Sequence, residues 1–239
     1  MRKFGAKTFD SESFLDKFVE ESDFFEVQAI QSNDYSFLKK YDKKIVVHSE
    51  HSGFDVNISN LSKYEFNLKA INFAKEVADL CQAEKIVIHP GYNEGANCSL
   101  ENVISFLREN FDSRFCIENV PYEAFGYVKF GSSVDEIKRI VDETGVGFCF
   151  DINHAILYSV SVGLDYWDVL KDFEELSPRH YHLCGHNLKV GKDHFNFCDG
   201  DLDIERVFEI ISSDANITLE VDHLNVEEIF NDFNFVRKF

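Results

Sequence analysis

The chain has 239 residues, of which 44% are hydrophobic and 15% aromatic, and its formal net charge is −19. This length suits one large core, so we expect a single domain over residues 1–239. The acidic charge argues against a general nucleic-acid binder, because such proteins neutralise phosphates with Lys and Arg. No stretch approaches ~18 apolar residues and the first residues lack the apolar run of a signal peptide, so we expect a cytoplasmic protein without membrane contact. Nothing in the chain indicates an obligate protein partner.

Eight apolar stretches of strand length follow one another along the chain, each with a helical pattern after it. The expected strands are residues 3–8, 24–30, 44–48, 85–89, 114–118, 147–151, 180–183 and 216–221. The expected helices include one capped by Asp10, one with Phe66, Ala70, Phe73, Val77 and Leu80 on its apolar face, one opened by Ser99, one capped by Ser133 and stopped by Gly145, one over 165–176, and two capped by Asp203 and Asn225.

Eight strand–helix units are typical of a (β/α)8 TIM barrel in the α/β class. An open doubly wound sheet is the alternative. The count of eight and the absence of a Gly-rich phosphate fingerprint after the first strand favour the barrel.

The stretch Gly147–His154 shows how a site arises from this pattern. A buried strand ends on Asp151, and His154 is expected in the turn beyond. An Asp and a His at one strand end can bind a metal ion through an oxygen and a nitrogen. Taken alone, the Asp is as well explained as the N-cap of the next helix.

The ends of the other expected strands favour a metal site over a simple N-cap. From the third strand onward each expected strand ends in, or carries, a residue type that binds metals, and a further His lies in the loop after the seventh. These residues are His48, His89, Glu118, Asp151 with His154, His182, His194 and Glu220. Because all strand ends of a barrel converge at its C-terminal mouth, the sequence predicts a metal site there.

Histidine and carboxylate ligands suit Zn, Mn or Fe. Eight candidate ligands exceed the needs of one tetrahedral ion, so we expect two or three ions, most simply zinc. A pair of ions bridged by a carboxylate suits phosphoester hydrolysis, in which the metals activate a water and stabilise the leaving oxygen.

These motifs resemble the xylose isomerase-like barrel superfamily and, within it, the endonuclease IV branch (AP endonuclease family 2). The similarity runs from His48 to Glu220 and includes Ile88-His89-Pro90-Gly91 and Asp151-Ile152-Asn153-His154-Ala155. The resemblance implies a zinc cluster in which Glu118 bridges two ions, with Glu118, Glu220 and Asp151 as the catalytic carboxylates. It also implies cleavage of the phosphodiester 5′ to an abasic site in DNA.

Two positions depart from that pattern. The resemblance calls for an Asp where this chain has Lys192, with Asp193 as a neighbouring substitute, and for an aromatic DNA-inserting residue where it has His51. Together with Asn57, these two residues are expected to contact the substrate. The substrate is then either abasic-site DNA or another phosphoester.

A sugar isomerase or epimerase of the same superfamily is the alternative. It needs one divalent ion on a Glu, Asp, His, Glu set, which Glu118, Asp151, His182 and Glu220 supply. The two Glu residues would then act as acid and base on a small carbonyl sugar. This scheme gives four histidines, His48, His89, His154 and His194, no metal role.

Overall fold

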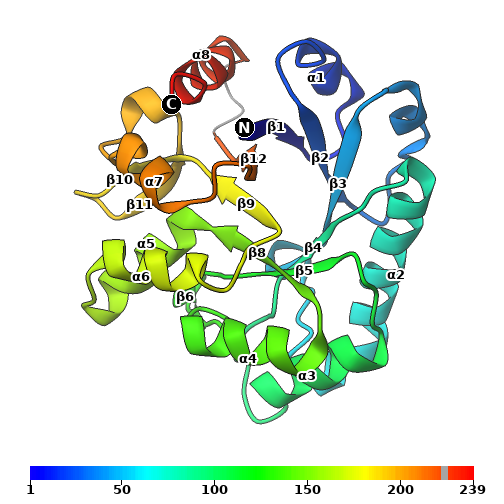
Figure 1. Cartoon of the computed structure of the whole chain (residues 1–239). Coiled ribbons are helices and arrows are strands. Elements are labelled where there is room, and N and C mark those ends of the chain that lie inside the picture. The colour runs from blue at the N-terminus through cyan, green and yellow to red at the C-terminus, as the bar shows by residue number, and fades with distance from the viewer. Residues whose placement is uncertain (222–225) are drawn as a thin grey trace.

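The computed structural model describes residues 1–221 and 226–239, apart from the side chain of Lys192. Eight parallel strands form a closed barrel in the order β1-β12-β9-β8-β5-β4-β3-β2, and the helices surround it (Figure 1). Closure comes from β1 pairing with β12, with Lys3 opposite Asn216 and Ala6 opposite Leu219. The predicted TIM barrel is therefore confirmed, and the open sheet is excluded.

The barrel strands are short and mostly buried along their whole length, as expected for parallel strands covered by helices. They are β1 Lys3–Thr8, β2 Phe24–Ala29, β3 Lys44–Ser49, β4 Ile86–Ile88, β5 Phe115–Glu118, β8 Gly147–Asp151, β9 His180–Leu183 and β12 Asn216–Leu219. The helices are α1 Glu12–Lys17, α2 Tyr64–Cys81, α3 Leu100–Glu109, α4 Val134–Thr144, α5 Ile152–Val162, α6 Tyr166–Glu174, α7 Ile204–Ile210 and α8 Val226–Val236. A short 3-10 helix, Ser36–Lys40, takes the place of a helix between β2 and β3.

Two hairpins lie outside the barrel and had no counterpart in the sequence prediction. One joins β6 Glu123–Ala124 to β7 Tyr127–Val128, and the other joins β10 Gly185–Asn187 to β11 Lys192–Phe195. Their strands have two to four residues, too short for a clear alternation of apolar and polar side chains. Both hairpins contribute residues to the cavity described below.

The barrel interior changes from apolar to polar along the strands. One buried layer consists of Phe24, Val46, Val87, Cys116 and Cys149. Gly5 leaves the space that the Phe24 ring fills, since a Cβ on Gly5 would lie 2.3 Å from that ring. Side chains two residues apart share a face of a strand. The next inward layer therefore carries Glu26, His48, His89, Glu118 and Asp151. Polar and ionisable side chains thus lie directly above the apolar layer of the barrel interior.

Several helix predictions need correction. Ser11, not Asp10, caps α1, with its side chain accepting from the Phe14 N–H. On the predicted face of α2, Ala70 and Val77 are buried and Phe73 and Leu80 pack against the core, whereas Phe66 is exposed. The buried face also includes Asn67, Ile71, Ala74 and Ala78. Helix α5 was missed, and His154 lies in its first turn rather than in a loop. The predicted cap Asn225 lies outside the described residues.

The predicted N-caps at Ser99, Ser133 and Asp203 and the left-handed stop at Gly145 are confirmed, and the helix expected over 165–176 is α6, with Asp165 as its N-cap. Among the described helices, none is both long and apolar enough to span a bilayer.

Candidate metal centre

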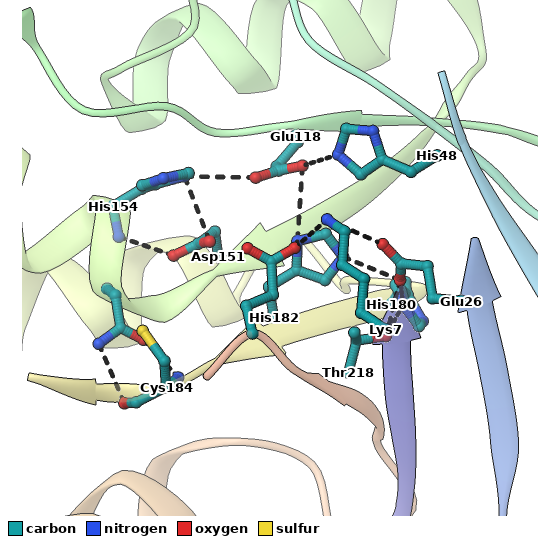
Figure 2. A network of polar contacts seen from close by, with 12 residues as sticks. Lys7, Glu26, His48, Glu118, Asp151, His154, His180, His182, Cys184 and Thr218 are labelled. Atoms are coloured by element: carbon teal, nitrogen blue, oxygen red, sulfur yellow. Dashed lines mark hydrogen bonds and ion pairs between the residues drawn. The ribbon is translucent and has the colours of Figure 1, made fainter. Parts of the chain in front are cut away.

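Glu118, at the end of β5, is the centre of the polar layer. Its Oε2 lies 3.2 Å from His48 Nε2 and 3.1 Å from His89 Nε2, and its Oε1 lies 3.3 Å from His154 Nδ1. The side chain is 1% exposed. Burial disfavours its charge, but His89 and His182 hold the pKa of Glu118 well below its usual range. One carboxylate is thus shared by three imidazoles, and Figure 2 shows two of them, His48 and His154, on either side of Glu118.

His48 presents an unprotonated nitrogen to this carboxylate. Its Nδ1 lies 2.8 Å from the Ser49 carbonyl oxygen, which can only accept, so Nδ1 carries the proton. In the neutral ring Nε2 then faces Glu118 Oε2 as a second acceptor. Two acceptors in contact require a proton or a cation between them.

His182, in β9, repeats this arrangement from the opposite side. Its Nε2 lies 3.1 Å from Glu26 Oε2, so Nε2–H donates to that carboxylate. Its Nδ1 is fully buried without a hydrogen-bond partner among the described residues, yet it lies 3.0 Å from Glu220 Oε1 and 3.5 Å from Glu118 Oε2. Burial opposes protonation, but the surrounding carboxylates raise the pKa of His182 well above its usual value. A divalent ion would take the place of that proton.

Asp151 has two structural roles at the end of β8. Its Oδ1 accepts the His154 backbone N–H at 2.7 Å and so caps α5, while its Oδ2 lies 3.3 Å from His154 Nδ1. Burial and the neighbouring carboxylates raise the pKa of Asp151 to about 6. Burial lowers the pKa of His154, but Asp151 and Glu118 outweigh it and raise this pKa to about 9. The N-cap interpretation of Asp151 and the site interpretation are therefore compatible.

Glu220 follows β12 and completes the ring of carboxylates. Its Oε2 lies 3.5 Å from His194 Nε2, and His194 Nδ1 lies 3.0 Å from Asp193 Oδ1. Burial opposes protonation of His194, but Asp193 and Glu220 raise its pKa to about 11. His194 adopts a left-handed backbone conformation with φ of 61°, uncommon for a residue other than glycine. All eight predicted ligands are thus brought into one connected network.

Four residues of this network were not predicted from the sequence, namely Lys7, Glu26, His180 and Thr218. Lys7, at the end of β1, forms ion pairs with Glu220 and, at 3.2 Å, with Glu26. Glu26 is fully buried, and its Oε2 also receives His180 Nε2 at 3.0 Å and the Thr218 hydroxyl at 2.7 Å. The signal was present, because Glu26 lies two residues after Phe24 in β2 and shares its inward face.

A cavity of about 770 Å³ opens above the network. Six predicted ligands line it, namely His48, His89, Glu118, His154, His194 and Glu220, whereas Asp151 and His182 lie beneath. Its walls are largely apolar and include Phe9, Phe125 and Phe195. This volume is typical of a small-molecule site.

The three predicted substrate contacts fare differently. His51 lines the cavity and stacks on His89 with ring centroids 4.8 Å apart. Asn57 is fully buried, and its amide donates to the Tyr92 carbonyl and accepts the Tyr92 N–H, so the structure does not bring it to the cavity. The Lys192 side chain lies outside the described residues.

The family model for the xylose isomerase-like TIM barrel matches residues 34–235. The chain belongs to this family. Comparison with curated proteins finds no significant match. Among solved structures, a D-tagatose 3-epimerase-like protein superposes with a TM-score of 0.80 at 20% identity, covering 99% of this chain and 96% of the other.

Two further solved structures are endonucleases rather than epimerases. Endonuclease IV from Thermus thermophilus gives a TM-score of 0.72 at 19% identity, covering 99% and 98% of the two chains. An AP endonuclease of family 2 from Brucella melitensis gives 0.76 at 15% identity, covering 100% and 99%. At these identities the likeness establishes the fold, and the branch is open between hydrolase and isomerase.

The residues present suit a divalent metal of this family. Several groups of three His, Cys, Asp or Glu side chains have ligand atoms within 4.8 Å of one another, including His48, His89 and Glu118, and Glu118, Asp151 and His154. The stronger argument is that His48 Nε2 lies 3.2 Å from a Glu118 oxygen and His182 Nδ1 lies 3.0 Å from a Glu220 oxygen, so a proton or a cation must lie between each pair.

Proposed function

We propose that this protein is a metal-dependent isomerase or epimerase acting on a small carbonyl sugar or a related polyol. The observation that carries the proposal is the position of two carboxylates, Glu118 and Glu220, around one histidine at the floor of the cavity. A cavity of this size admits a monosaccharide. The net charge of −19 is unfavourable for a duplex nucleic acid as substrate.

Glu118, Asp151, His182 and Glu220 would hold the ion. When bound, a divalent ion in such a site polarises a substrate carbonyl and makes the adjacent C–H more acidic. The protein's own part is proton transfer. One carboxylate removes a proton from the carbon next to the carbonyl, and a protonated histidine beside the other carboxylate supplies the proton that returns to that carbon or its neighbour.

The surroundings of the two carboxylates suit this work. Burial disfavours the charge of Glu220, but His182 and Lys7 hold its pKa well below the usual range, so it is available as a base. Glu118 is held ionised in the same way by His89 and His182. Histidines on both carboxylates, His194 on Glu220 and His154 on Glu118, carry raised pKa values and can supply the returning proton.

The test is proton exchange in D2O. Metal-loaded protein is incubated with a panel of ketoses and aldoses, and deuterium uptake and epimer formation are followed by NMR. We expect uptake at the carbon next to the carbonyl, reduced at least ~100-fold in Glu118→Gln and Glu220→Gln and unchanged in the exposed control Glu84→Gln. Metal-loaded protein without exchange on any sugar would contradict the proposal.

Phosphoester hydrolysis is the second candidate, and a separate observation favours it. His48, His89 and His154 all contact Glu118, which an enzyme with one ion does not require. Metal analysis separates the two functions. Two or more ions per chain, with metal-dependent cleavage of abasic-site duplex DNA or of a simple phosphodiester that His89→Ala abolishes, would favour hydrolysis. One ion, with exchange that His89→Ala retains, would favour the isomerase.

A further inference from the structure

Lys129 is a cation in the cavity wall that the proposed chemistry does not use. It lines the cavity, and only 7% of the residue is exposed. Its ammonium lies 4.6 Å from the centroid of the Tyr92 ring and 5.8 Å from that of Phe125. Within residues 1–221 and 226–239, no carboxylate or hydrogen-bond acceptor pairs with it. A buried lysine without a counter-charge is costly.

The other lysine among the described lining residues has a different environment. Lys7 is held by two carboxylates, Glu26 and Glu220. Lys129 has aromatic faces instead, which attract a cation more weakly than a carboxylate and leave its N–H donors free. Burial lowers the pKa of Lys129, and no neighbouring acid offsets this effect. An arriving anion would supply the missing partner.

The backbone fixes Lys129 beside the metal centre. Lys129 forms an antiparallel bridge with Tyr92, and the flanking hydrogen bonds are Phe130 N–H to the Gly91 carbonyl at 3.1 Å and Asn93 N–H to the Val128 carbonyl at 2.9 Å. The segment Gly91–Tyr92 directly follows His89 and Pro90. The backbone of Lys129 is therefore paired with the segment that follows His89, a predicted metal ligand.

The hairpin β6–β7 borders the same part of the cavity. Its two-residue turn has Phe125 at φ of 55° and Gly126 at 79°, both in the left-handed region. This conformation is unfavourable for a bulky residue such as Phe. Phe125 is 86% exposed yet lines the cavity. An exposed aromatic held in a strained turn next to an unpaired cation is consistent with a binding subsite.

We propose that Lys129 binds an anionic group of the substrate, so that the ligand of this cavity is a small polyol carrying a phosphate or carboxylate. The inference rests on the proposed function for the small, hydroxylated nature of the ligand and adds its charged end. The reacting carbon would lie at Glu118 and Glu220 while the anion is held at the wall. Phosphate and carboxylate share this chemistry and are separated by the experiment.

Isothermal titration calorimetry on the metal-loaded protein tests the assignment with three probes: glycerol 3-phosphate, glycerate and glycerol. We expect one or both anionic probes to bind at least ten-fold more tightly than glycerol, and the tighter of the two to identify the anion. In Lys129→Met this advantage should fall at least ten-fold, and Lys129→Arg should keep part of it. The exposed Lys69→Met, which removes the same charge outside the cavity, should behave as wild type.

Two results would overturn the assignment. One is anionic probes binding no more tightly than glycerol. The other is an equal advantage in wild type and Lys129→Met, which would place the anion on the metal. Thermal melts check folding, and Lys129→Gln replaces the Met variant if that one unfolds. Tight, Lys129-dependent binding with no proton exchange on any sugar would sink the proposed isomerase and leave the anion subsite standing.

Discussion

Glu26 offers the sharpest test of how the protein prepares its metal site, because it touches no cavity and acts only through its neighbours. Its carboxylate fixes the proton of His182 on Nε2 and so directs Nδ1 to the centre. In Glu26→Gln the amide can present N–H to that nitrogen. The imidazole proton would then move to Nδ1, where it blocks a metal.

The expected size follows from partners of this kind elsewhere. Loss of a carboxylate that orients a metal-bound histidine lowers metal affinity about 10–100-fold, or about 1.4–2.8 kcal/mol. We expect the upper half of this range, because Glu26 is fully buried and no water can substitute for it. Zinc affinity is measured by competition with a chromophoric chelator at constant pH.

Thr218→Val is the matched control. It removes the hydroxyl that donates to the same Glu26 oxygen at 2.7 Å but leaves the pairing with His182 intact. We expect its zinc affinity to stay within three-fold of wild type. If Glu26→Gln also binds zinc within three-fold, or if both variants lose affinity equally, the carboxylate does not act by orienting His182.

Three further predictions concern metal binding, stability at acid pH and the apolar layer inside the barrel. Glu118→Ala should lose bound metal, since three histidines contact that carboxylate; full occupancy by elemental analysis would contradict its central role. Hydrogen bonds from Asn60, Lys63 and Asn57 outweigh burial and lower the pKa of Glu94 from 4.5 to about 2. The folded state then gains stability from the ionised carboxylate above about pH 4.5 and loses it as the pH falls towards 2. Glu94→Gln should therefore lower Tm at pH 7 and converge with wild type only as the pH falls to about 2 in calorimetry, and a pH-independent difference would argue against this account. Gly5→Ala should destabilise the fold by about 1–3 kcal/mol in urea titration, because the new Cβ meets the Phe24 ring; wild-type stability would mean that the ring moves freely.

The barrel could be predicted because its signal is long-range and repeated. Eight buried runs separated by amphipathic stretches leave few alternatives, and the ligand-type residues fall at equivalent strand ends. The strand bounds agree to within one or two residues. Element ends are set by individual hydrogen bonds, so Asp10 was taken for the cap in place of Ser11.

Other features could not be predicted because they depend on contacts distant in sequence. Helix α5 has isoleucine, alanine and valine around most of its circumference, so its periodicity is weak next to the strand before it. Lys129 gave no signal in sequence, since its importance lies in the carboxylate it lacks. Asn57 belongs to a recognisable motif, but its amide fixes Tyr92, and a Cβ at Gly91 would lie 2.3 Å from its oxygen. Asn57 therefore supports the backbone segment that follows His89 and pairs with Lys129.

The pairing of β1 with β12 also determines when the site can exist. Lys7 and Glu220 are separated by 213 positions and meet only once the first and last strands are side by side. A chain still missing β12 would have Glu118, Asp151 and His182 but not the fourth ligand, Glu220. Metal binding should therefore be among the last steps of folding, and a tightly bound ion would identify chains whose barrel has closed.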